Sequence, residues 1–186
     1  MSKQILIGLC GPAGCGKDSV ARIMANCAFT RYTLALPIKK GLEAMLGIDL
    51  DVWDDRERKE AVIPWLGKSP RQVAQTLGTE WGRQHVHPDL WVKLMLHRWD
   101  EVRESLSPRM VVTDVRFDNE ALAIINAGGT VWRVERPSVA PVAAHVSEQG
   151  ITPALIEGVV KNTGTLDQLE VNVIQWVSFL MKRYAK

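Results

Sequence analysis

The feature that most constrains the fold is a glycine-rich loop near the start of the chain. It reads GPAGCGKD over residues 11–18, follows a short apolar run at 4–10, and precedes apolar residues that recur at helical spacing up to residue 27. Its glycines and Lys17 have the spacing of a Walker A loop. Such a loop turns successive backbone N–H groups toward one phosphate cluster, and the following helix adds a favourable dipole. We therefore expect ATP to bind between the first strand and the first helix.

Magnesium is expected to accompany the triphosphate, although the loop departs from the usual pattern. Ser or Thr normally follows the lysine and holds the ion, whereas here Asp18 stands at that position and the hydroxyl follows at Ser19. Asp18 could ligate the ion directly or through water. We expect the ion because the charge of a triphosphate has to be neutralised while a phosphoryl group moves. Cys15, inside the loop, is interpreted as a small tolerated side chain and not as a nucleophile.

The rest of the chain alternates strand and helix signals. Short apolar strands are predicted at residues 32–35, 110–112, 130–135 and 158–161, with helices between them. Strands separated by helices favour a parallel sheet covered on both faces. We predict an α/β P-loop kinase fold, in which a parallel sheet of about five strands has helices on both faces and carries a mostly helical acceptor-binding insertion.

The length of 186 residues suits a single domain. Within it we expect a core at about residues 1–35 and 108–186, a helical acceptor-binding region at about 36–107, and a short lid at about 136–150. The charge-dense segment 49–60 in the helical region is interpreted as a solvated excursion.

Periodicity predicts which faces of the helical region are buried. A helix opened by a capping box at Ser69 should bury Val73, Leu77 and Trp81, and an apolar stripe from Val92 should continue as far as Leu106. The seven tryptophans are interpreted mostly as core residues. Trp91 is the exception, because it lies in a region that should face the acceptor.

A polar turn follows the strand at 110–112, at the edge where open parallel sheets bind ligands. Asp114 could orient magnesium or the acceptor there, or could cap a helix. Arg116, Asn119 and Glu120 follow at once, so one turn presents a cation and several hydrogen-bonding groups to the same cleft. That mixture suits an acceptor that carries a monophosphate.

Several basic residues are candidates for phosphate contacts. Arg71 could bind a phosphate bidentately or could be an exposed surface arginine, and the same alternatives hold for Lys39 and Arg83. Arg133 and Arg136 flank the end of the strand at 130–135.

The Pro- and Ala-rich stretch after these arginines, residues 137–144, could be a mobile lid that closes over ATP or a surface loop. His145 follows it. We interpret this histidine as structural and not as a general base, because phosphoryl transfer depends chiefly on positioning and on stabilising charge.

The bulk composition limits the partners. A net charge of +2, with basic residues dispersed among acidic ones, argues against direct nucleic-acid binding. The three cysteines lack the spacing of a zinc site and the even count of a disulfide scaffold, so we expect reduced thiols. The first residues show neither a signal peptide nor a membrane span. We expect a cytoplasmic location and small-molecule nucleotides as partners.

Taken together, these motifs resemble the deoxynucleoside monophosphate kinases of bacteriophages, within the nucleoside monophosphate kinase group of P-loop proteins. The shared segments are GLCGPAGCGKDSVA at 8–21, LALPIKKGLEAMLG at 34–47, SPRQVAQTLGTEWGR at 69–83, PDLWVKL at 88–94, VVTDVRFDNEA at 111–121, HVSE at 145–148 and KNTGTLDQL at 161–169. The chain departs from the family where DPIK and NDG are often found, since it has Leu36 and Thr163 at the acidic positions.

The resemblance and the residue patterns lead to one set of expected site residues. The expected catalytic residues are Lys17, Arg71, Asp114, Arg116 and Arg136. The expected ATP contacts are Gly11, Ala13, Gly14, Cys15, Gly16, Lys17, Asp18, Ser19, Arg133 and Asn162. The expected acceptor contacts are Ile38, Lys39, Arg71, Gln75, Thr79, Trp91, Arg116, Asn119 and Glu120, and the expected magnesium ligands are Asp18, Ser19 and Asp114.

The resemblance implies ATP- and magnesium-dependent phosphorylation of deoxynucleoside monophosphates, a supply of precursors for phage DNA synthesis in the host cytoplasm, and a homodimer. Two alternatives remain open at this point. One is a P-loop kinase for another phosphorylated metabolite, such as phosphomevalonate or dephospho-coenzyme A. The other is a non-catalytic nucleotide-gated switch that associates with DNA, against which the absence of a basic sequence block counts.

Overall fold

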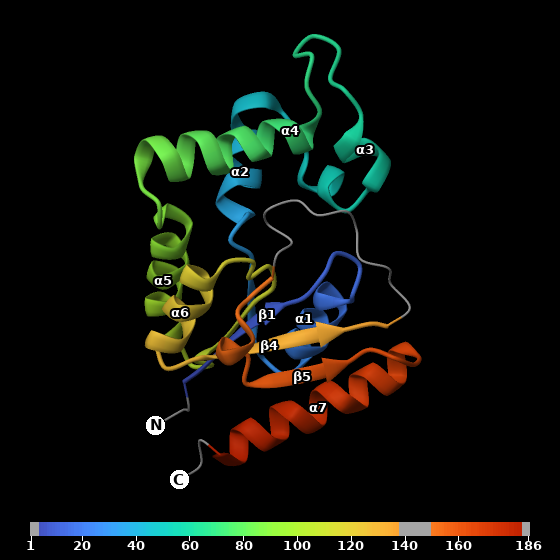
Figure 1. Cartoon of the computed structure of the whole chain (residues 1–186), viewed down its shortest axis with the longest axis vertical. Helices are drawn as coiled ribbons and strands as arrows, with labels where there is room; N and C mark the ends of the chain where they lie inside the picture. Colours follow the sequence, from blue (N-terminus) through green and yellow to red (C-terminus); the bar gives the residue numbers. More distant parts are fainter. Residues whose placement is uncertain (1–3, 138–149, 184–186) are drawn as a thin grey trace. The chain divides into compact units, whose positions relative to one another are not determined.

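A computed structural model describes residues 4–137 and 150–183 (Figure 1). Its centre is a sheet of five parallel strands in the order β2-β3-β1-β4-β5. The strands are β1 (Ile5–Cys10), β2 (Thr30–Tyr32), β3 (Arg109–Val112), β4 (Thr130–Glu135) and β5 (Gly158–Lys161). Every residue of β1 is buried, as expected for the central strand of a sheet that is covered on both faces. The predicted P-loop kinase sheet is confirmed.

Helices on both faces of the sheet complete its core (Figure 1). On one face, α1 (Lys17–Asn26) and α7 (Leu166–Arg183) pack against each other and against the side chains of Ile5, Ile7 and Leu9. On the other face, α6 (Asp118–Asn126) packs on β1 and β4, where Ile124 lies directly over Gly8. Gly8 therefore has no room for a side chain, because an added Cβ would come within 2.7 Å of Ile124.

The chain divides into two compact units. Unit 1 comprises residues 1–34 and 95–186 and contains the sheet, whereas unit 2 comprises residues 35–94. Unit 2 was expected as a helical region at about 36–107, and it is built from α2 (Leu36–Leu46), η1 (Leu50–Trp53), α3 (Arg56–Glu60), α4 (Pro70–Gln75), η2 (Thr76–Val86) and the start of α5 (Leu90–Arg103). A short 3₁₀ turn, η4 (Pro153–Leu155), precedes β5 in unit 1.

Local signals account for the helix starts. Ser69 and Gln72 form the predicted capping box, in which Ser69 N–H donates to Gln72 Oε1 at 2.8 Å and Gln72 N–H donates to Ser69 Oγ at 3.3 Å. The same arrangement between Thr165 and Gln168 opens α7. One boundary was predicted wrongly. Residues 33–35 are not extended, and α2 already begins at Leu36 because Pro37 is accommodated in a first helical turn.

The packing inside unit 2 centres on two glycines. Beyond α4 the helix widens through η2, where His87 N–H donates to Gly82 C=O five residues back. Gly78 and Gly82 are both buried: an added Cβ on Gly78 would lie 2.9 Å from Ile38, and one on Gly82 would lie 2.4 Å from the ring of Trp91. The Trp91 indole N–H donates to Gly78 C=O at 2.7 Å.

Val73 and Leu77, predicted to be buried, are only half-buried, and three further apolar side chains are exposed. Trp81 and Trp65 are 50% and 69% exposed, so their assignment to the core is wrong. Gly82 packs inward in place of Trp81, because only glycine admits the Trp91 ring there. Leu106 is exposed because α5 ends at Arg103, short of the predicted stripe.

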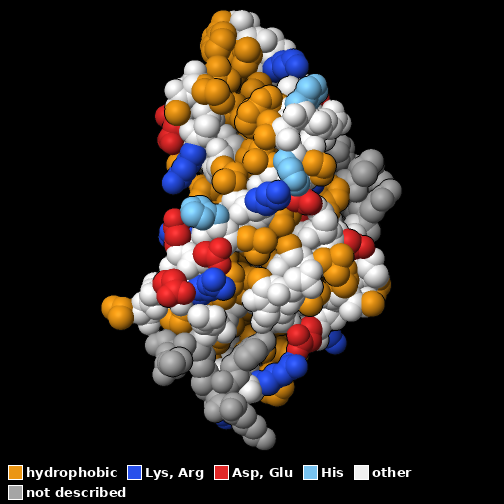
Figure 2. Space-filling view, turned by 90° about the vertical axis from the view of Figure 1, so that its left-hand side faces the viewer, with side chains coloured by type: hydrophobic (Ala, Val, Ile, Leu, Met, Phe, Trp, Pro, Cys, Tyr) orange, Lys and Arg blue, Asp and Glu red, His pale blue; other side chains and the backbone are white. Residues whose placement is uncertain are grey.

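The surface charges and the helices bear on other partners. On the face drawn in Figure 2, Lys and Arg side chains are interspersed with Asp and Glu, and the residues described there form no continuous basic patch. No helix among residues 4–137 and 150–183 is long and apolar enough to cross a membrane.

Candidate active site

The phosphate loop lies between β1 and α1, where the sequence placed it. Gly11, Gly14 and Gly16 all have positive φ, at 133°, 77° and 102°. At Gly11 the backbone passes so close to β4 that an added Cβ would lie 2.5 Å from Val134 C=O. Gly16 begins α1 without a side-chain cap, which leaves the N–H groups of the first helical turn directed at the loop. The loop thus has the geometry of an anion site.

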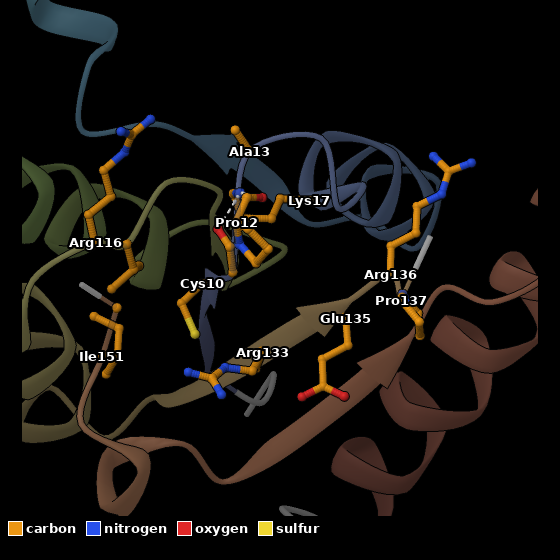
Figure 3. Close-up of a pocket in the computed structure, with 13 residues that line it drawn as sticks. Cys10, Pro12, Ala13, Lys17, Arg116, Arg133, Glu135, Arg136, Pro137 and Ile151 are labelled. Atoms are coloured by element: carbon orange, nitrogen blue, oxygen red, sulfur yellow. Dashed lines mark hydrogen bonds between the residues drawn. The ribbon is translucent and has the colours of Figure 1, made fainter. Parts of the chain in front are cut away.

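The Lys17 ammonium group lies over the same loop. Its Nζ donates to the carbonyl oxygens of Gly11 at 2.7 Å and Pro12 at 2.9 Å (Figure 3). Cys15 is fully buried and packs under the loop, 3.8 Å from Nζ, which fits a packing residue and not a nucleophile. The lysine is therefore held where the terminal phosphates of a bound nucleotide would come to lie.

A cavity of about 410 Å³ opens beside the loop, at the carboxyl ends of β1 and β4. Its lining residues come from the loop, from the turn after β3, from the end of β4 and from the segment before η4. They are Cys10, Gly11, Pro12, Ala13, Lys17, Val115, Arg116, Arg133, Glu135, Arg136, Pro137, Gly150 and Ile151. Six residues expected from the sequence thus meet here: Gly11, Ala13, Lys17, Arg116, Arg133 and Arg136.

Three arginines give the cavity its cationic character. Arg116 and Arg136 lie on opposite sides of it, and the Arg133 guanidinium lies beside Cys10 Sγ (Figure 3). Burial raises the pKa of the Cys10 thiol, and the positive charges of Arg133 and Lys17 oppose this rise only in part. Cys10 therefore stays a neutral thiol at pH 7, and the anion-binding capacity of the cavity comes from the cations.

Asp114 is anchored to the backbone at the end of unit 1. Its Oδ1 accepts the N–H of Leu34 at 2.8 Å, across 80 positions of sequence. The carboxylate also lies near Tyr32, where burial, reinforced by the negative charge of Asp114, raises the pKa of the phenol to about 12. Of the two alternatives for Asp114, the helix cap is wrong, because α6 begins at Asp118. Asp114 instead accepts the N–H of Leu34, in the turn after β2.

Glu120 has a different role from the one expected. The side chain is only 1% exposed, and Oε2 accepts the backbone N–H groups of Arg116 at 2.7 Å and Phe117 at 3.2 Å. It therefore holds the turn that presents Arg116 and leaves almost no surface for a ligand, so its assignment as an acceptor contact is corrected. The reason is the capping geometry of α6, in which Glu120 is the third helical residue and folds back over the turn.

Asn162 supports the phosphate loop. Its Nδ2 donates to Cys15 C=O at 2.9 Å, in a buried position, and an added Cβ on Gly16 would lie 2.4 Å from that nitrogen. The amide thus ties the turn after β5 to the phosphate loop, and its expected contact with ATP stays a prediction. Asp118 supports another part of the cavity wall. It accepts the N–H of Thr152 at 2.9 Å, next to Ile151, which lines the cavity.

The expected magnesium ligands do not form a closed protein site. Asp18 is exposed and lies 4.0 Å from Arg31, and Ser19 is half-buried in the first turn of α1. Within residues 4–137 and 150–183 there is no group of three His, Cys, Asp or Glu side chains that could hold a metal.

The expected acceptor residues of unit 2 fall into two classes. Ile38 and Trp91 are packing residues, 9% and 5% exposed, so neither offers the contact surface that was expected. Gln75 and Thr79 are exposed, four residues apart, and follow Arg71 at the same interval along one helix face. Arg71 is ion-paired with Glu60 at 2.7 Å.

Lys39, on α2, lies over the Trp53 ring, with Nζ 5.6 Å from the ring centroid. In unit 1, Asn119 is exposed in the first turn of α6. The predicted lid falls mostly on residues 138–149. These residues, which include His145, lie outside the described part of the chain.

Sequence reasoning missed Cys10, Val115, Glu135 and Ile151, which also line the cavity. Cys10 and Glu135 are the last residues of β1 and β4, so the rule that ligands bind at the carboxyl ends of parallel strands could have found them. No sequence signal marks Ile151, because its place in the lining depends on contacts with residues far away in the sequence, such as the bond of the neighbouring Thr152 to Asp118.

Comparison with known proteins shows the family to which the chain belongs. Residues 64–173 match the family described as deoxynucleotide monophosphate kinase. A protein of Acanthamoeba polyphaga mimivirus with that name is 31% identical over 156 residues, which cover 78% of this chain and 81% of the viral protein. The deoxynucleoside-5'-monophosphate kinase of Escherichia phage T5 is 26% identical over 178 residues, which cover 63% and 70%.

A solved structure shows the same fold at low identity. Shikimate kinase from Aquifex aeolicus superposes with a TM-score of 0.54 at 12% identity, over 93% of this chain and 96% of that one. Such a likeness concerns the P-loop kinase architecture alone. The family match and the viral relative go further, and the chain belongs to the deoxynucleotide monophosphate kinase family of P-loop phosphotransferases.

Proposed function

We propose that this chain transfers the γ-phosphoryl group of ATP to the phosphate of a deoxynucleoside monophosphate. The observation that supports this best is the cavity in which the phosphate loop and Lys17 face Arg116, Arg133 and Arg136. Four cationic side chains around one space suit a reaction in which negative charge is spread over a transferred phosphoryl group. The names of the mimivirus and phage T5 relatives indicate the acceptor class.

On the donor side, the loop N–H groups and Lys17 would bind the β- and γ-phosphates. The Lys17 ammonium group then exchanges the carbonyl oxygens of Gly11 and Pro12 for phosphate oxygens. An oxygen of the acceptor phosphate forms a bond to the γ-phosphorus while the bond from this phosphorus to the β,γ-bridging oxygen breaks, and ADP leaves. Arg116 and Arg136, on either side of the cavity, would stabilise the charge that develops.

Magnesium fits the donor set of the site. Asp18, Ser19 and Asp114 supply carboxylate and hydroxyl oxygens, the ligands that Mg²⁺ prefers, and nucleotide kinases hold the ion with few protein ligands plus substrate phosphates. Bound magnesium would supply charge neutralisation, while Asp18, exposed at the start of α1, is the residue to hold it directly or through water.

On the acceptor side, we assign the monophosphate to unit 2. Arg71, Gln75 and Thr79 form one exposed polar stripe along α4 and η2, and Lys39 contributes a further cation from α2. A guanidinium can bind a phosphate through two parallel hydrogen bonds, which a lysine cannot. Arg71 is therefore the principal phosphate ligand in this proposal.

A coupled assay of ADP release tests the function directly. The four common deoxynucleoside monophosphates are offered with ATP and Mg²⁺, and phosphomevalonate and dephospho-coenzyme A serve as competing acceptors. We expect turnover with at least one deoxynucleotide and none with the two metabolites. Turnover with neither class, or with a metabolite alone, contradicts the proposal.

The biological setting follows from the same relatives. We propose that the enzyme supplies deoxynucleotides for viral DNA synthesis in an infected cell and that it acts as a homodimer, as the resemblance to phage kinases implies. Light scattering on the purified protein would give a mass near twice 20.8 kDa for the dimer.

A further inference from the structure

We propose that Glu60 is a positioning residue that holds the Arg71 guanidinium ready for the acceptor phosphate. Glu60 ends the charge-dense segment 49–60, to which the sequence assigned no function. Its Oε1 accepts a hydrogen bond from Arg71 Nη1 at 2.7 Å, within unit 2. This inference rests on the proposed function, because it assumes that Arg71 binds a monophosphate.

The fold of unit 2 brings the two residues together from both ends of a short excursion. Asp55 caps α3, since its Oδ1 accepts the N–H groups of Glu57 at 2.8 Å and Arg58 at 3.1 Å. The chain then turns back through a bridge in which Ile63 N–H donates to Lys68 C=O at 3.0 Å. The capping box at Ser69 starts α4, with Arg71 in its first turn. Both helix starts are thus fixed by hydrogen bonds of their own.

The Arg71–Glu60 pair adds little to the stability of the fold, so we look for its effect in the binding of the acceptor. The side chains of Arg71 and Glu60 are 51% and 47% exposed, and ion pairs of that kind have small effects on stability. An arginine side chain, however, has several rotatable bonds whose freedom is lost when it binds a phosphate. A carboxylate that already orients the guanidinium removes part of that cost before the ligand arrives.

The contact also leaves the guanidinium able to bind a ligand. A guanidinium has five N–H donors in a planar fork, and the bond to Glu60 uses Nη1. Donors on the other edge of the fork can meet two phosphate oxygens. The negative charge of Glu60 acts in the opposite direction, because it repels a dianionic phosphate. Orientation and repulsion therefore predict opposite changes in affinity when Glu60 is removed, and we infer that orientation is the larger effect.

The experiment measures KM for the acceptor, KM for ATP and kcat in Glu60→Ala and Glu60→Gln. The matched control is Asp51→Ala, which removes a second exposed pair with a guanidinium at 2.7 Å, Asp51 with Arg58, in the same segment. We expect Glu60→Ala to raise the acceptor KM about two- to fivefold, the range of an exposed ion pair, with KM for ATP and kcat unchanged. Glu60→Gln, which keeps an oxygen acceptor, should restore most of the loss, and Asp51→Ala should change nothing.

A double variant tests whether the effect passes through the arginine. In an Arg71→Ala background, Glu60→Ala should no longer change the acceptor KM. A lower or unchanged KM in Glu60→Ala, an equal rise in Asp51→Ala, or an undiminished effect without Arg71 would each overturn the inference. Calorimetric binding of the monophosphate alone gives the same comparison without turnover. If the parent enzyme phosphorylates no deoxynucleotide, the proposed function fails, which is a distinct result.

Discussion

Substitution of the single residue Lys17 tests the proposed ATP site. Its ammonium group is placed over the phosphate loop by bonds to Gly11 and Pro12. Because the lysine acts on charge that develops in the transition state, Lys17→Ala should lower kcat by about 100-fold or more. The measurement is steady-state ADP release, with Lys182→Ala, an exposed lysine of α7, as the control. Activity within a few fold of the parent would contradict the assignment.

Tyr32 reports on the charge of Asp114. Burial, assisted by the Asp114 carboxylate, raises the pKa of this phenol to about 12 from its ordinary value of 10.0. The unfolded chain therefore loses the proton first, so the stability due to the neutral phenol is complete below pH 10 and is lost as the pH rises from 10.0 to about 12.

The corresponding experiment is a spectrophotometric titration of tyrosinate in Tyr184→Phe, which leaves Tyr32 as the single tyrosine. Asp114→Asn should lower the pKa of Tyr32, while the amide oxygen can still accept the Leu34 N–H and keep the fold. An unchanged titration curve in Asp114→Asn would show that the carboxylate does not face the phenol.

At the scale of elements, the two capping boxes allow a matched comparison. Ser69 starts the helix that carries Arg71, whereas Thr165 starts α7 in the core of unit 1. Loss of such a cap costs about 1 kcal/mol of helix stability. Ser69→Ala should therefore raise the acceptor KM severalfold and leave the KM for ATP unchanged, because α4 carries Arg71, the proposed ligand of the acceptor phosphate.

Thr165→Ala should lower the free energy of unfolding by a similar amount and leave the acceptor KM unchanged, because α7 belongs to unit 1 whereas Arg71 belongs to unit 2. Urea unfolding and steady-state kinetics on both variants check the two halves of this prediction. Equal kinetic effects would mean that capping acts only on global stability.

At the scale of the whole molecule, the nucleotide should act as a stabilising ligand. ATP with Mg²⁺ at 100 times its Kd should stabilise the folded chain by about 2.7 kcal/mol. For a chain of this size that corresponds to a rise in Tm of roughly 5–10 °C. Differential scanning calorimetry measures the shift, and Lys17→Ala should lose most of it. An equal shift in the lysine variant would place the nucleotide away from the loop.

Much of the site could be predicted from the sequence where neighbouring residues determine the geometry. The phosphate loop needs glycines at positions of positive φ, a strand before it and a helix after it, all within some twenty residues. Strands β4 and β5 were predicted with their observed bounds, and the capping box at Ser69 was predicted at its observed place, for the same local reason. Family motifs then supplied the acceptor class, which local physics does not encode.

The tertiary structure decided the roles that depend on residues far apart in the chain. Asn162 reaches the loop across 147 positions, and Asp114 bonds to Leu34 across 80. Glu120 is drawn inward by its own turn, and Trp81 is displaced to the surface because Trp91 fits only against glycine. The phosphate loop was thus determined by the sequence alone, since its conformation is local. Which side chains support that loop and which can reach a ligand was decided by packing, because burial and long-range hydrogen bonds exist only once the elements have assembled.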